Sequence, residues 1–249
     1  MTRTDSIPVV ADTSVLVLTG AGVSAESGIP TFRDSGGLWE QHSMEQVATP
    51  EGFREDPRLV WRFYSERRAK GRACRPNPGH LALAALERRL GDRFLLVTQN
   101  IDGLHRQAGS ERVIELHGQL YQTRCAHCDR EPFDDLEGYD DERPPLCDVC
   151  EAAGRMGLLR PAVVWFGEML DPLHFEAISR FLEEGRRGRL VFLAAGTSGS
   201  VWPASALVDE ARRAGAGTWL VNAAAADNAS RFEHFVQGRS GEVLPGLLG

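Results

Sequence analysis

The stretch that decides the fold is Val15-Leu16-Val17-Leu18-Thr19-Gly20-Ala21-Gly22-Val23-Ser24-Ala25. Its first five residues form a short apolar run that ends at a glycine, which is typical of a buried parallel strand. The glycine-rich turn after them lets backbone N–H groups approach a pyrophosphate at a helix N-terminus. A plain tight turn would explain the same residues, so this stretch alone leaves the ligand open.

Further apolar runs and helical patterns alternate along the chain. The apolar runs predict strands at 94–98, 113–116, 162–166, 190–195 and 218–221. The helical patterns predict helices at 57–73, 78–90, 173–186 and 203–214. This alternation predicts an α/β protein with a Rossmann-like, doubly wound parallel sheet that binds ligands at the carboxyl ends of its strands.

Two stretches, 30–75 and 118–160, interrupt the alternation. The first holds no strand where a simple βαβ unit would place its second one. A dinucleotide-binding dehydrogenase would carry an acidic residue at the end of that strand, about twenty residues after the glycines. Glu40 has the spacing but lies in the inserted region beside Trp39. An ordinary hydride-transferring dehydrogenase is therefore disfavoured.

Four of the five cysteines form two pairs, Cys125-x-x-Cys128 and Cys147-x-x-Cys150, with eighteen residues between them. This is the spacing of a tetrahedral zinc ribbon. Four thiolates fill the coordination shell, so we expect one structural Zn²⁺ per chain; free redox thiols are the alternative. The fifth cysteine, Cys74, stands alone, and an odd count argues against a secreted disulfide framework.

Charge and hydropathy exclude other classes of function. The net charge of -7 argues against a nonspecific nucleic-acid binder. No apolar run approaches the ~18 residues that span a bilayer, and residues 1–11 lack the apolar core of a secretion signal. We therefore expect a cytoplasmic protein with no membrane or nucleic-acid partner. Ten acidic residues and two arginines lie between Asp129 and Glu151, which predicts a solvated loop where a basic partner could dock.

Five blocks, in order, resemble the NAD-binding and catalytic motifs of the sirtuin family. They are Gly20 to Asp34 (GAGVSAESGIPTFRD) with Gly37-Leu38-Trp39, then Gln99-Asn100-Ile101-Asp102, Leu116-His117-Gly118, Val164-Trp165-Phe166-Gly167-Glu168 and Gly196-Thr197-Ser198. The resemblance runs from about residue 12 to the C-terminus. It implies one sirtuin-type catalytic domain, 1–249, with a large lobe of 1–29, 76–117 and 161–249. A helical insertion at 30–75 and a zinc-ribbon insertion at 118–160 would form the smaller lobe.

The resemblance implies NAD⁺ as co-substrate and assigns its contacts. The implied cofactor-binding residues are Gly20, Ala21, Gly22, Glu26, Thr31, Phe32, Arg33, Trp39, Gln99, Asn100, Ile101, Asp102, Gly196, Thr197, Ser198, Asn222 and Ser240. Arg33 would meet phosphate or ribose oxygens, and Phe32 would shield the reactive sugar carbon from water. Residues 223–225, three alanines, depart from the more polar pattern common in the family, which puts contacts beyond Asn222 in doubt.

The implied chemistry starts with cleavage of the bond between nicotinamide and ribose, and the acyl-lysine carbonyl oxygen captures the ribose carbon. His117 would be the base that activates a ribose hydroxyl, a role that suits a pKa near neutrality. Asn100 and Asp102 are the other implied catalytic residues. Without the resemblance, a histidine after an apolar strand is more often a core residue, and residues 99–102 would be turn residues.

The implied substrate contacts come from two regions. Val164, Phe166, Gly167 and Glu168 belong to a stretch that resembles the strand pairing with substrate backbone by β-augmentation. Tyr64 and Arg67 lie three residues apart on one face of the 57–73 helix. This spacing resembles the class III subgroup, which removes succinyl and malonyl groups, and Ala48 matches its pocket-widening small residue. Arg67 offers a bidentate fork to a carboxylate and Tyr64 one donor; an ordinary amphipathic helix is the alternative.

We therefore expect an NAD-dependent protein-lysine deacylase that removes succinyl, malonyl and also acetyl groups, releasing nicotinamide and O-acyl-ADP-ribose. Its partners would be proteins or peptides with acylated lysine, and the sequence assigns no oligomeric state. A general deacetylase and an NAD-dependent ADP-ribosyltransferase are the enzymatic alternatives. A zinc-ribbon protein that only binds NAD is the non-enzymatic one.

Overall fold

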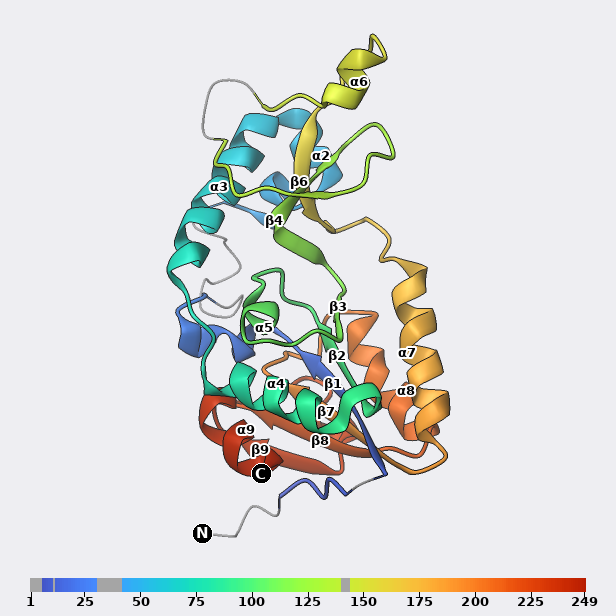
Figure 1. Cartoon of the computed structure of the whole chain (residues 1–249). Helices are drawn as coiled ribbons and strands as arrows, with labels where there is room; N and C mark the ends of the chain where they lie inside the picture. Colours follow the sequence, from blue (N-terminus) through green and yellow to red (C-terminus); the bar gives the residue numbers. More distant parts are fainter. Residues whose placement is uncertain (1–5, 11, 31–41, 140–143) are drawn as a thin grey trace.

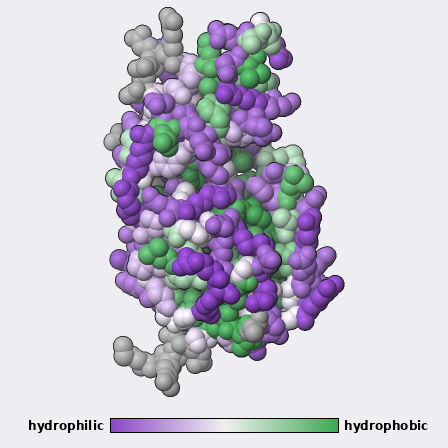
Figure 2. Space-filling model, in the orientation of Figure 1, coloured by the Kyte–Doolittle hydropathy of each residue, from purple (hydrophilic) through white to green (hydrophobic). Residues whose placement is uncertain are grey.

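The computed structural model describes residues 6–10, 12–30, 42–139 and 144–249 (Figure 1). A six-stranded sheet with its helices forms one end of the molecule, and a three-stranded sheet with a second set of helices forms the other. Hydrophilic residues cover most of the face seen in Figure 2, and hydrophobic residues show there in smaller groups. None of the helices in the described part of the chain has the length and hydropathy to cross a bilayer.

The large sheet is parallel throughout, in the order β3-β2-β1-β7-β8-β9. Its strands are β1 (Thr13–Thr19), β2 (Phe94–Thr98), β3 (Val113–Glu115), β7 (Arg189–Ala195), β8 (Gly217–Asn222) and β9 (His234–Gln237). Successive side chains of a strand point to opposite faces. Val15 and Val17 accordingly pack under helices α4 (Pro78–Leu90) and α9 (Ser240–Leu248). Leu16 and Leu18 face α7 (Pro172–Gly185) and α8 (Leu207–Arg213), which confirms the doubly wound fold.

The smaller lobe is built around an antiparallel sheet in the order β5-β4-β6. Its elements are β4 (Gly118–Cys125), β5 (Phe133–Asp134), β6 (Leu159–Val163), α1 (Met44–Val47), α2 (Pro50–Glu55), α3 (Pro57–Ala73) and α6 (Asp148–Ala152). The prediction of a strand at 162–166 in the parallel sheet was wrong. The strand ends at Val163 and pairs with β4, so the chain leaves the small sheet after residue 163 rather than at 161.

Short turns complete the chain. They are the 3₁₀ turns Ala21–Val23, Ala25–Ser27, Gly91–Arg93, Ala204–Ala206 and Ala229–Arg231, and helix α5 (Leu104–Gln107). The first two follow the glycine-rich stretch. The sequence predicted the N-terminus of an α-helix at this point. The structure has two tight turns instead, so the backbone N–H groups at the site belong to those turns.

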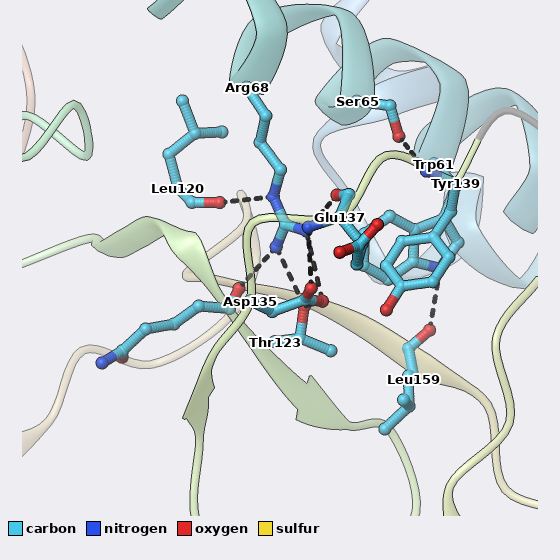
Figure 3. Close-up of polar contacts among 10 residues, drawn as sticks. Trp61, Ser65, Arg68, Leu120, Thr123, Asp135, Glu137, Tyr139 and Leu159 are labelled. Carbon is cyan, nitrogen blue, oxygen red and sulfur yellow. Dashed lines mark hydrogen bonds and ion pairs between the residues drawn. The ribbon is translucent and has the colours of Figure 1, made fainter. Parts of the chain in front are cut away.

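Helix α3 is fixed to the small sheet by one of its faces (Figure 3). It starts at Pro57 because the Asp56 carboxylate accepts hydrogen bonds from the next turn. Trp61 donates its indole N–H to the carbonyl of Leu159 at 2.9 Å. Arg68, 1% exposed, donates to the Asp135 carboxylate, the Thr123 hydroxyl and the carbonyls of Leu120, Gln122 and Glu137. Because a buried guanidinium has to find partners for its donors, this network fixes the register of α3 on the sheet.

Candidate active site

A cleft of about 1940 Å³ runs between the carboxyl edge of the parallel sheet and the smaller lobe. It brings together residues from both lobes that the sequence placed in the site. They are Gly20, Ala21, Gly22, Glu26, Ala48, Tyr64, Arg67, Gln99, Asn100, Ile101, Asp102, His117, Val164, Phe166, Gly167, Glu168, Gly196, Thr197, Ser198, Asn222 and Ser240. Thr31, Phe32, Arg33 and Trp39, also predicted to bind the cofactor, lie outside the described residues.

Gly20 and Gly22 lie so close to the backbone of Gly196 that there is no room for a side chain at either position. Gly22 donates its N–H to the carbonyl of Gly196 at 2.8 Å. A Cβ on Gly20 or on Gly22 would lie 2.8 Å from that same oxygen. Gly196 has a φ of +63°, which a glycine adopts readily. The turn after β1 and the turn after β7 therefore form one backbone cradle at the edge of the sheet.

Asn100 and Asp102 are held by a residue that the sequence analysis quoted but did not assign to the site. The hydroxyl of Ser24 donates to the Asp102 carboxylate at 2.7 Å, and the Asn100 amide donates to the same hydroxyl at 3.1 Å. The Asn100 amide also donates to the carbonyl of Gly20. Burial raises the pKa of Asp102, while the hydrogen bond from Ser24 lowers it. The loop 100–102 is thus tied to the glycine turn.

Two buried histidines lie behind this loop, and the sequence analysis missed both. His80 contacts Ser24 at 3.3 Å through Nε2, and its Nδ1 accepts the N–H of Asn77. We infer that Nε2 carries the proton and donates to Ser24. Burial lowers the pKa of His80 to about 4 and that of His105 to about 3. Both rings are therefore neutral at physiological pH, and His80 forms its hydrogen bonds as one fixed tautomer.

His117 lies between the cofactor side and the small lobe. Its Nδ1 lies 2.9 Å from the carbonyl of Gln99, so Nδ1 carries the proton in the neutral ring. Nε2 then keeps its lone pair, as a general base requires. Burial lowers the pKa of His117, and the hydrogen bond to Gln99 partly offsets this. The geometry therefore favours the basic form at neutral pH.

The cofactor side of the cleft is joined by polar contacts between strand ends. The side-chain amide of Gln99 donates to the Thr197 hydroxyl at 3.1 Å, and Asn222 donates to the Thr197 carbonyl at 2.9 Å. The Glu26 carboxylate accepts the N–H of Gly241 at 2.7 Å. That hydrogen bond links the glycine turn to the start of α9, next to Ser240.

The opposite end of the cleft is formed by α3 and the stretch after β6. The Tyr64 hydroxyl is buried, and its oxygen accepts the indole N–H of Trp165 at 3.0 Å. Arg67 is half-buried beside it, with its guanidinium carbon 5.3 Å from the centre of the Phe63 ring. Ala48 also lines the cleft, and its carbonyl accepts the backbone N–H of Phe166 at 2.9 Å. The predicted pair therefore faces the same cleft as His117.

Glu168 differs from the other residues predicted to contact substrate. Its carboxylate accepts two hydrogen bonds from Arg160 and one from the backbone N–H of Trp165. The pKa of Glu168 is lowered because hydrogen bonds from Arg160 and Trp165 outweigh its burial. The side chain thus holds the turn 165–168 in place.

The four paired cysteines form one cluster in the smaller lobe. All four sulfur atoms lie within 4.8 Å of one another. Cys125 and Cys150 are 3.7 Å apart and Cys128 and Cys147 3.8 Å, measured between sulfurs. A zinc ion bonded to four sulfurs at about 2.3 Å gives tetrahedron edges of about 3.8 Å. The cluster therefore suits one zinc ion with a closed, structural coordination shell.

Replacing one ligand, as Cys147→Ser, should remove about one zinc per chain and lower the melting temperature, because the ion stabilises the lobe that carries α3. Metal analysis and thermal unfolding measure both. Cys74→Ser is the matched control, since Cys74 is not part of the cluster, and it should keep its zinc. A chelator that slows turnover while the protein stays folded would contradict a purely structural metal.

Comparison with known proteins agrees with this site. The model of the Sir2 family matches residues 20–203. An NAD-dependent protein deacylase of Shewanella oneidensis is 46% identical over 241 residues, covering 94% of this chain and 92% of the relative. The crystal structure of a Sir2 homolog–NAD complex superposes with a TM-score of 0.82 at 40% identity, covering 94% of this chain and 87% of that one. The structure of Sir2Af2 bound to a myristoylated histone peptide superposes with a TM-score of 0.70 at 33% identity, covering 94% of this chain and 89% of that one.

The chain belongs to the Sir2 family. This confirms the resemblance to the sirtuins on which the site residues were assigned. The roles of the individual residues and the subgroup implied by Tyr64 and Arg67 stay predictions.

Proposed function

We propose that this Sir2-family NAD-dependent protein deacylase acts on lysines that carry acidic acyl groups, succinyl and malonyl above all, and also on acetyl-lysine. The observation that carries the proposal is the position of Tyr64 and Arg67, which line the cleft that contains His117. A carboxylate enters an apolar pocket only where donors replace its lost hydration. Arg67 supplies the charge and a planar fork of donors.

The remaining roles follow from the contacts in the cleft. NAD⁺, when bound, supplies the ribose carbon that accepts the acyl oxygen. In the cradle formed by residues 20–22 and 196–198, the N–H groups of the three glycines already donate within the chain. Those of Ala21, Thr197 and Ser198, which line the cleft, would meet the phosphates of NAD⁺. His117 holds its lone pair on Nε2 to take a proton from a ribose hydroxyl. The N–H groups of Val164 and Phe166 already donate to the carbonyls of His117 and Ala48. A lysine-bearing peptide would therefore pair with the backbone carbonyls of 164–167, in the mode by which an extended peptide joins a sheet edge.

The test is NAD-dependent deacylation of one peptide carrying acetyl-, malonyl-, succinyl- or glutaryl-lysine in turn. We expect kcat/KM for the malonyl or succinyl peptide to equal or exceed that for the acetyl peptide, with O-acyl-ADP-ribose as a product. Acetyl activity alone would leave a general deacetylase. ADP-ribosylated protein without O-acyl-ADP-ribose would instead favour the transferase. The cytoplasmic location stays a prediction.

A further inference from the structure

Trp165 is a residue of the cleft to which no role has been given so far. It is 3% exposed and follows the last residue of β6 by two positions. Its indole N–H donates to the Tyr64 oxygen at 3.0 Å. Its ring packs against Phe53, with ring centres 5.3 Å apart. Trp165 thus connects the peptide-facing turn with helix α3.

The position of the indole ring is restrained by Arg160 and Glu168. The guanidinium carbon of Arg160 lies 3.4 Å from the centre of the ring, over its face. The same guanidinium binds the Glu168 carboxylate, which also accepts the backbone N–H of Trp165. Arg160 and Glu168 therefore determine where the indole N–H points.

The direction of the hydrogen bond to Tyr64 has a chemical consequence. An indole N–H can only donate, so the phenol oxygen of Tyr64 must accept. The phenol proton then points away from Trp165. Among the described residues it has no acceptor, and Tyr64 lines the cleft beside Arg67. Hydrogen bonds in a chain also polarise one another, which strengthens the phenol as a donor.

We infer that Trp165 is a positioning residue that turns the Tyr64 hydroxyl into an oriented donor for the carboxylate of an acidic acyl group, and so contributes to acyl specificity. This inference rests on the proposed function. Trp165 would influence acyl specificity only through its hydrogen bond to Tyr64. Burial raises the pKa of Tyr64 to about 12, so the phenol keeps its proton at every working pH.

The test is Trp165→Phe, which keeps an aromatic face for Arg160 and removes the indole N–H together with the pyrrole part of the ring. We expect the ratio of succinyl to acetyl kcat/KM to fall by roughly two- to tenfold, the effect of one neutral hydrogen bond. The change should appear in KM for the succinyl peptide. Tyr64→Phe should lower the ratio at least as far. The double variant should match Tyr64→Phe alone, because Trp165 acts only through that hydroxyl.

Trp61→Phe is the matched control. Trp61 is also buried and also donates its indole N–H in the smaller lobe, but to the carbonyl of Leu159. Trp61→Phe should lower the melting temperature and leave the ratio of succinyl to acetyl kcat/KM as in the wild type. Equal losses on both peptides in Trp165→Phe, or losses that add to those of Tyr64→Phe, would overturn the inference. A wild type without activity on acidic acyl groups would overturn the proposed function itself, which separates the two failures.

Discussion

His117→Ala should lower kcat/KM by roughly 10²–10⁴-fold, the range for a positioned general base. The ring is placed by one hydrogen bond, from Nδ1 to the Gln99 carbonyl, and its other nitrogen is the proton acceptor. His117→Gln should lose as much, because an amide can reproduce that hydrogen bond but has no basic nitrogen. NAD binding, measured by calorimetry, should survive in both variants. Near-full activity in either would remove His117 from the mechanism.

The pH dependence gives a second measure of the same residue. Because burial lowers the pKa of His117, the neutral base form persists to a lower pH than the usual 6.5. In the wild type, kcat/KM should therefore fall on the acid side with a midpoint below 6.5, since this profile reports groups of the free enzyme. His117→Gln should lose that acid limb. An acid limb at or above 6.5 that His117→Gln retains would assign the titration to another group.

Arg67→Met should lower kcat/KM for a succinyl-lysine peptide by roughly 10- to 150-fold. A hydrogen bond to a charged group contributes about 1.5–3 kcal/mol, and 1.4 kcal/mol corresponds to a factor of ten. Acetyl-lysine has no carboxylate, so its efficiency should fall far less, or rise as the pocket becomes more apolar. The quantity to measure is the ratio of the two efficiencies in wild type and variant.

Arg62→Met is the matched control for this change. Arg62 lies on the same helix, is exposed and does not line the cleft. Its substitution should leave the ratio unchanged. Equal losses of succinyl and acetyl activity in Arg67→Met would mean that Arg67 supports the helix rather than the acyl group. The chain would then act as a general deacetylase.

Local sequence predicted much of the fold because several elements carry their own start signals. Helices α3 and α4 have the predicted bounds, and each starts with a capping residue followed by proline, Asp56-Pro57 and Asn77-Pro78. Strand β9 was missed because His234–Gln237 is a largely exposed edge strand without an apolar run. Strand β6 was assigned to the wrong sheet, since an apolar run does not reveal which strand it will pair with.

In the site, too, local sequence predicted some features and missed those that depend on long-range packing. Motifs identified the residues that line the cleft, but not the buried ones that orient them. Ser24 and His80 are 56 positions apart and meet only after folding. Trp165 was quoted in a motif, yet its contact with Tyr64 spans 101 positions. Such contacts form only when α3 and α4 pack against loops. Residue spacing along the chain does not predict that packing.

The backbone cradle at the edge of the sheet has a consequence for the order of events during synthesis. Its two halves, at Gly22 and Gly196, are separated by about 174 residues. At ribosomal rates of ~5–20 residues per second, the first half waits roughly 9–35 s for the second to be made. Strand β1 waits equally for β7, its partner along seven residue pairs. Strand β2 can pair with one edge of β1 earlier, but the edge that meets β7 stays unpaired through most of translation, an interval in which chaperone protection matters.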